Sequence, residues 1–109
     1  EIVLAAVKQL GYALLYADEK FKSDREIVLA AVKSDSRGLQ FADETLKADR
    51  EIVLAAVEEC GYALEFADKK FRSDREIVLV AIKQTVNALQ FADKKLIAEF
   101  KEEGLIEDN

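Results

Sequence analysis

The chain has 109 residues, of which 50% are hydrophobic and 35% are charged, and its formal net charge is −6. This composition is typical of a soluble folded domain, and no apolar run approaches the roughly 20 residues that span a membrane. Histidine is absent and cysteine occurs once, which removes the commonest general base, the cysteine clusters that bind zinc and any disulfide within the chain.

The sequence repeats with a period of 25 residues. The decapeptide DREIVLAAVK and its close variants recur at 24–33, 49–58 and 74–83. Four units fit this period: 1–25, 26–50, 51–75 and 76–100. Because self-similarity at such a period is typical of solenoids, we predict that residues 1–109 form a single helical-repeat domain.

The first segment of each unit, DREIVLAAVK, is predicted to be a helix. Its Ile and Val residues favour a strand, but the Ala-Ala pair favours a helix and an Asp precedes each start, where it can act as an N-cap. Ser23 with Glu26, and Ser73 with Glu76, also fit the spacing of a capping box. The alternative, an α/β horseshoe, lacks the asparagine ladder of that architecture.

The first unit begins at Glu1, without Met and without the Asp-Arg pair of the later units, so we interpret the sequence as an excised piece or as one whose start was not recorded. Ile2, Val3 and Leu4 belong to a helix that is apolar nearly all round and needs cover on several sides. If no preceding segment supplies it, we expect this edge to form a homodimer with a second copy. The alternative is a monomer with a frayed first helix.

The second segment of each unit is also predicted to be a helix, because apolar residues recur at i, i+3 and i+7. These positions are Leu14, Ala17, Phe21; Leu39, Ala42, Leu46; Leu64, Ala67, Phe71; and Leu89, Ala92, Leu96. Gly11 and Gly61 lie where a helix is expected to end and turn. The last unit departs from the others at Ile97 and Phe100, and residues 98–109 are predicted to form a C-terminal cap. The fold class is therefore all-α, a solenoid of about four helix-turn-helix repeats.

Successive units alternate in sequence. Units one and three share GYAL, and units two and four share LQFAD, which favours a pair of units as the building block. The pattern DREIVLAAVKQxGYALxxAD resembles a family of short tandem helical repeats of unknown function, found in bacterial and protist proteins. The resemblance covers residues 1 to about 97 and weakens at 34–38 and 84–88, where SDSRG and QTVNA replace the usual turn. It implies an architecture, and no activity, cofactor or catalytic residue.

The regular carboxylate series offers the one arrangement that resembles a chemical site. Its members are Asp18, Asp43, Asp68 and Asp93. Each is expected at the edge of the second helix's apolar stripe, and Lys22, Lys47 and Arg72 follow three of them at i+4. We interpret them as structural residues in helical ion pairs. The alternative is a carboxylate ladder for cations or a basic partner, or a hydrolase that uses paired carboxylates.

The polar strip that remains on the first helix gives a candidate surface for a protein partner. This lane comprises Glu26, Ala30, Lys33, Glu51, Ala55, Glu58, Glu76, Val80 and Lys83. We expect a non-enzymatic interaction module or structural scaffold without a cofactor, because helical stacks create extended binding faces. The alternative is that the lane binds no partner and is a solvent-exposed face of the stack.

A helical array that binds nucleic acid is a further alternative. Basic residues gather at Lys69, Lys70, Arg72, Arg75, Lys94 and Lys95. The aromatic residues, however, recur at core positions, which leaves few rings to stack on bases. A single cysteine is compatible with a reducing compartment such as the cytoplasm, which is our expectation for the location.

Overall fold

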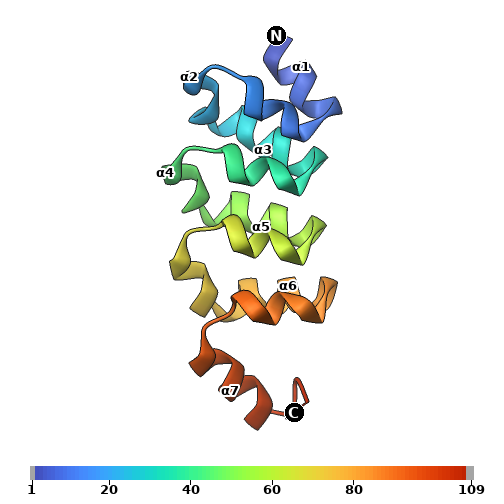
Figure 1. The fold of residues 1–109 in the computed structure, drawn as a ribbon, viewed down its shortest axis with the longest axis vertical. Coiled ribbons are helices and arrows are strands. Elements are labelled where there is room, and N and C mark those ends of the chain that lie inside the picture. The colour runs from blue at the N-terminus through green and yellow to red at the C-terminus, as the bar shows by residue number, and fades with distance from the viewer. Residues whose placement is uncertain (1, 108–109) are drawn as a thin grey trace.

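The computed structural model describes residues 2–107, and within that range all regular structure is helical. The helices form an elongated stack with extents of 49, 22 and 17 Å (Figure 1). The all-α helical-repeat prediction is therefore confirmed. None of the helices in the described range is long and apolar enough to cross a membrane.

The long helices form one layer of the stack, where they follow one another as parallel rungs (Figure 1). They are α1 (Ile2–Gln9), α3 (Arg25–Ser34), α5 (Arg50–Glu59) and α6 (Arg75–Gln84). Asp24 caps α3, since its carboxylate accepts a hydrogen bond from the amide of Ile27 at 3.2 Å, and Asp49 and Asp74 cap α5 and α6 in the same way. The predicted aspartate N-caps are therefore confirmed.

The predicted capping boxes at Ser23 and Ser73 are wrong. The Ser23 hydroxyl donates to the carbonyl of Lys20 at 3.3 Å, and the Ser73 hydroxyl donates to that of Lys70 at 3.4 Å. Each serine thus belongs to the end of the preceding helix, because the aspartate one residue later already occupies the N-cap position.

The second segment of each unit is broken into two pieces, so the prediction of one continuous helix is wrong. A 3-10 helix comes first: η1 (Gly11–Tyr16), η2 (Ser36–Phe41), η3 (Gly61–Phe66) and η5 (Val86–Phe91). A second piece follows: α2 (Glu19–Lys22), α4 (Glu44–Lys47), η4 (Lys69–Ser73) and α7 (Lys94–Glu102). Ala17 and Asp18 separate η1 from α2 because both have extended backbone, with ψ of 156° and 149°. Each complete unit therefore has three helical pieces.

The core runs without interruption from Val7 in the first unit to Phe100 in α7. Leu14, Leu39 and Leu64 are fully buried at the positions predicted for them. Backbone hydrogen bonds also join successive units: the amides of Asp43, Asp68 and Asp93 donate to the carbonyls of Lys22, Lys47 and Arg72 at 2.9, 3.0 and 2.8 Å. Each unit is thus completed by its neighbours, as expected for a stack whose single repeats are too small to bury their own faces.

Two glycines permit close contact within pairs of units. A Cβ atom added at Gly11 would lie 2.2 Å from the carbonyl oxygen of Ala31, and one added at Gly61 would lie 2.3 Å from that of Ala81. Neither glycine has a positive φ, so close approach and not a left-handed turn explains them. At the junction between the second and third units the equivalent residue is Ser36, which carries a side chain. The junctions therefore alternate, as the sequence of the units does.

The C-terminal end of the stack is covered by α7. This helix has nine residues, whereas its counterparts α2 and α4 have four each. Its Phe100 is fully buried, and the guanidinium of Arg75 lies 5.1 Å from the centre of the Phe100 ring. Gly104 follows the helix with a φ of 77°, a conformation that favours glycine and stops the helix.

Candidate functional site

The nine residues of the predicted lane lie on the exposed face of three adjacent rungs. Glu26, Ala30 and Lys33 belong to α3, Glu51, Ala55 and Glu58 to α5, and Glu76, Val80 and Lys83 to α6. The acidic and basic members are exposed, while Ala30, Ala55 and Val80 are half-buried. The period of 25 residues thus places one triplet from each unit on one side of the stack.

Three shallow hollows open along this lane, and we call them together the groove. The first has a volume of about 420 Å³ and lies between α1 and α3. The second, of about 540 Å³, lies between α3 and α5 and shares Leu29 and Lys33 with the first. The third, of about 550 Å³, lies on α6. The first two hollows therefore adjoin each other at α3.

Half-buried leucines form the floor of the groove. Leu29, Leu54 and Leu79 occupy the same position in three successive units and line the three hollows. Sequence reasoning did not assign them to the lane, because the long helices are apolar nearly all round and offer no clear exposed face. Their recurrence three residues after each lane glutamate is the signal that could have found them.

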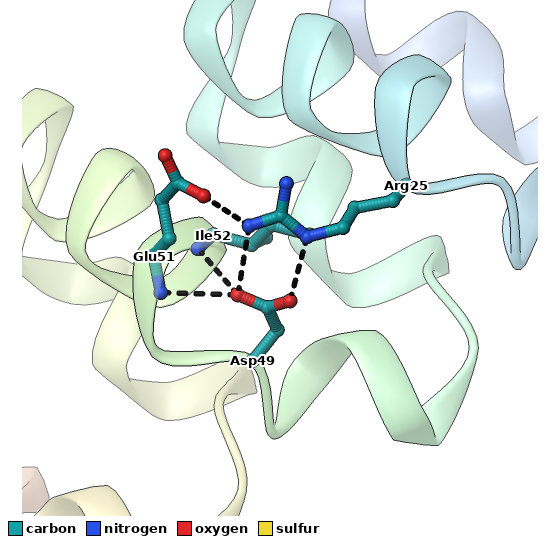
Figure 2. A network of polar contacts seen from close by, with 4 residues as sticks. All are labelled: Arg25, Asp49, Glu51 and Ile52. Atoms are coloured by element: carbon teal, nitrogen blue, oxygen red, sulfur yellow. Dashed lines mark hydrogen bonds and ion pairs between the residues drawn. The ribbon is translucent and has the colours of Figure 1, made fainter.

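One edge of the groove is held by a ladder of ion pairs between units. The Arg25 side chain donates from Nε to Asp49 Oδ2 at 2.8 Å and also pairs with Glu51 (Figure 2). Arg50 pairs with Asp74 and Glu76 in the same manner. The recurrent Asp-Arg-Glu triplet is explained by this geometry, since each arginine joins its own rung to the N-cap and the first turn of the next rung.

The ladder continues into the C-terminal cap. Arg75 has no further unit to join and instead pairs with Glu103, donating from Nη1 to Oε2 at 2.9 Å. Hydrogen bonds from Arg25 hold the pKa of Asp49 below its ordinary value, and those from Arg75 lower the pKa of Glu103. Glu51 and Glu76 are therefore committed to contacts between units, although they also line the groove.

The other edge of the groove carries charges that remain available. In residues 2–107, Lys8, Lys33, Glu58 and Lys83 form no ion pair with one another or with other side chains. They lie in the last turns of the four long helices. A basic residue is favoured at that end of a helix by the macrodipole, so Glu58 departs from the local preference. The groove thus combines an apolar floor, an edge on which Arg25 and Arg50 each pair with two carboxylates, and an edge of mixed charge.

The four repeated aspartates do not belong to the groove. Asp18, Asp43, Asp68 and Asp93 each cap the second piece of their unit, accepting a hydrogen bond from the amide two residues later at 2.8 to 3.2 Å. A hydrogen bond from the Thr45 hydroxyl also lowers the pKa of Asp43.

The expected ion pairs between these aspartates and the basic residue at i+4 are not formed. Lys22 pairs with Glu19 at 3.4 Å, and Lys47 pairs with Glu44 at 3.5 Å. The physical reason is that the helix is interrupted before each aspartate. The aspartate is therefore the N-cap of a new helix and not a residue inside a continuous one. Within residues 2–107, no three acidic or cysteine side chains are grouped so that they could hold a metal ion.

The N-terminal edge of the stack exposes an apolar hollow of about 240 Å³, which Ile2, Val3, Val7 and Tyr16 help to line. Ile2 is 88% exposed and Tyr16 is 80% exposed. The uncovered edge expected at the first unit is thus present in this chain, and its pairing with a second copy stays a prediction.

Comparison with known protein families gives a match to a family model described as "Domain of unknown function (DUF4116)". The model matches residues 1–47 and, a second time, residues 49–97. Each match spans nearly two 25-residue units, so the unit of this domain is a pair, in agreement with the alternation of the sequence. No curated protein and no solved structure matches the chain.

Proposed function

Because the chain belongs to the family of the domain of unknown function DUF4116, which brings no established activity, we propose a role from the geometry: a non-enzymatic module that binds a segment of another protein in the groove. The observation that carries this proposal is the row of half-buried leucines between two charged edges. An apolar floor with polar edges is the surface against which an amphipathic helix packs.

The spacing of the rungs supports a helical occupant. Packed helices lie about 8–10 Å apart, so Leu29, Leu54 and Leu79 repeat at roughly that distance along the groove. Seven residues of an α-helix advance about 10.5 Å. A bound helix that crosses the rungs would therefore present one apolar side chain to each leucine if those side chains recur every seven residues. Its charged residues would face Lys33 and Glu58.

Two other functions have less support. A hydrolase that uses paired carboxylates needs two free acids at one cleft, whereas the repeated aspartates serve as helix caps one unit apart. A nucleic-acid array needs a basic track, whereas the groove carries Glu26, Glu51 and Glu58 beside its lysines.

Site-specific photo-crosslinking tests the proposal. A photoreactive residue replaces Ala55 in the groove or, as the matched control, Glu65 in η3, which is exposed and lies outside the groove. We expect adducts to one protein segment from position 55 and not from position 65, and the Lys33→Glu, Glu58→Lys double variant should weaken them. Equal labelling from both positions, or adducts that charge reversal leaves unchanged, would count against a binding groove.

A further inference from the structure

The short helices follow one another along one edge of the stack, and α7 begins at the end of that row (Figure 1). In the first two units this edge contains ion pairs. Lys22 and Lys47 are partly buried, and each pairs with the glutamate three residues earlier, at 3.4 and 3.5 Å. Each of these two lysines thus has an acidic partner on its own helix.

The second half of the edge lacks these glutamates. The positions of Glu19 and Glu44 are taken by Lys69 and Lys94 in units three and four. Arg72, at the position of Lys47, has no ion pair among residues 2–107, and its Nε atom is buried without a hydrogen-bond acceptor. A buried donor without a partner costs free energy, and no acceptor within residues 2–107 offsets that cost at Arg72 Nε.

The stacking of units brings these basic residues into one patch. The amide of Asp93 donates to the carbonyl of Arg72 at 2.8 Å, so α7 begins where η4 ends. We call the patch the basic edge, and it comprises Lys69, Lys70, Arg72, Lys94 and Lys95. Its four lysines are exposed. Two acids lie within it, Asp68 and Asp93, and both use a carboxylate oxygen to accept a backbone amide.

We propose that the basic edge is a second interaction surface, separate from the groove, which binds an acidic segment of a partner protein. A carboxylate from such a segment would supply to Arg72 the charge that Glu19 and Glu44 supply to the lysines of the first two units. Guanidinium groups bind carboxylates through directed, charge-assisted hydrogen bonds. The first two units carry an acid at this position of the repeat, in α2 and α4, which occupy the place of η4.

The surroundings favour a protein segment over a nucleic acid. Phe71, the aromatic residue within η4, is only 4% exposed and offers no face on which a base could stack. The chain as a whole has a net charge of −6, which repels a long polyanion, whereas a short acidic peptide meets mainly the local field of the patch.

A titration of the ¹⁵N-labelled protein with hexaglutamate at low salt, followed by amide chemical shifts, tests this proposal. We expect shifts confined to residues 69–73 and 94–97, which weaken as salt is raised because screening reduces the attraction. Hexaglutamine is the control for non-electrostatic contact. The groove variant Ala55→Arg should bind hexaglutamate as the wild type does, which separates this surface from the proposed function.

The Lys69→Glu, Lys94→Glu variant supplies the decisive comparison. It introduces at both positions the residue that units one and two already contain, so the fold should persist, as its unperturbed amide spectrum elsewhere would show. We expect the affinity for hexaglutamate to fall by about tenfold or more, since two attractions become repulsions.

The proposal would be overturned by an absence of shifts at the basic edge, by equal shifts at 19–22 and 44–47, or by an unchanged affinity of the double variant. A stronger response of the same residues to hexauridylate than to hexaglutamate would overturn it in favour of nucleic acid.

Discussion

The substitution Gly61→Ala should separate the third and fourth units. The added Cβ would lie 2.3 Å from the carbonyl oxygen of Ala81 and 3.1 Å from the Thr85 Cγ2 atom. The nearer contact is to backbone, so α6 must move away from η3 by about 1 Å to restore an ordinary separation of about 3.5 Å. Overpacking of this kind costs about 1–3 kcal/mol.

One effect opposes this loss. Alanine restricts the unfolded chain more than glycine does, which favours the folded state by roughly 0.4–1 kcal/mol where the native backbone is compatible. We therefore expect a net decrease of about 1–2 kcal/mol in the free energy of unfolding, measured by urea denaturation with far-UV circular dichroism. Each lost kcal/mol should lower the melting temperature by about 4–8 °C in a chain of this size.

Gly38→Ala is the matched control. Its Cβ would lie 3.2 Å from the carbonyl oxygen of Gly11 and 3.4 Å from the Ala31 Cβ, and alanine stands at the equivalent positions of the other three units. We expect its stability to remain within about 0.5 kcal/mol of the wild type. If Gly61→Ala is as stable as the wild type, or if both variants lose the same amount, the reasoning about close junctions within pairs is refuted.

Three further predictions concern the ladder, the core and assembly. Hydrogen bonds from Arg25 lower the pKa of Asp49 in the folded state, so the carboxylate's contribution to stability is present above its ordinary pKa of 3.8 and is lost as pH falls through the lowered pKa. The Asp49→Asn variant should therefore show a weaker loss of unfolding free energy at acid pH than the wild type. An acid dependence equal to that of the wild type would contradict the ladder. Leu64→Ala should lower the free energy of unfolding by about 2–5 kcal/mol because Leu64 is 0% exposed, whereas Leu15→Ala should lower it far less because Leu15 is 42% exposed. Equal shifts in the denaturation midpoint of the two variants would contradict the assignment of Leu64 to the core and of Leu15 to the surface. If no preceding segment covers the N-terminal edge, a second copy should cover it, and Tyr16→Glu should then prevent dimerisation. Light scattering that gives a mass near 12.2 kDa for the wild type at every concentration would rule the dimer out in favour of a monomer with a frayed first helix.

Local patterns of the sequence predicted the repeat, the long helices and their caps. An aspartate before an apolar helical run acts within three residues, so Asp24 could be assigned without knowledge of the fold. The alternation of GYAL and LQFAD likewise gave the paired unit, because Gly11 and Gly61 mark the close junctions. The helix caps depend on residues close together in the sequence, and the pairing of units depends on the repeat period, so both can be found without the structure.

The break inside each second segment could not be predicted with the same tools. Apolar residues at 14, 17 and 21 fit a continuous α-helix, and a 3-10 helix followed by a capped turn buries the same positions. Asp18 was correctly singled out but placed inside a helix instead of at its start, so its partner was sought four residues later. The structure shows that its carboxylate accepts the amide of Lys20, two residues later.

The sequence proposed the lane, but not the ion-pair ladder or the leucine floor beside it. The lane was located because its polar residues recur on one face. The ladder was missed because Arg25 meets Asp49 and Glu51 at the start of the next rung, 24 and 26 residues away. Only the stacking of units creates that contact. The leucine floor was missed for a related reason: Leu29 belongs to the core by pattern, and its partial exposure is decided by how closely the rungs pack.

The measurement that bears most directly on the proposed function is the affinity of the groove for the segment that crosslinking identifies. Fluorescence anisotropy with that segment as a labelled peptide would compare the wild type, Ala55→Arg and Glu65→Arg. We predict that Ala55→Arg, whose side chain fills the second hollow and covers its leucine floor, lowers the affinity by about tenfold to a hundredfold, a loss of about 1.4–2.8 kcal/mol, while Glu65→Arg binds as the wild type does. An Ala55→Arg variant that folds normally and binds the peptide with undiminished affinity would contradict the account.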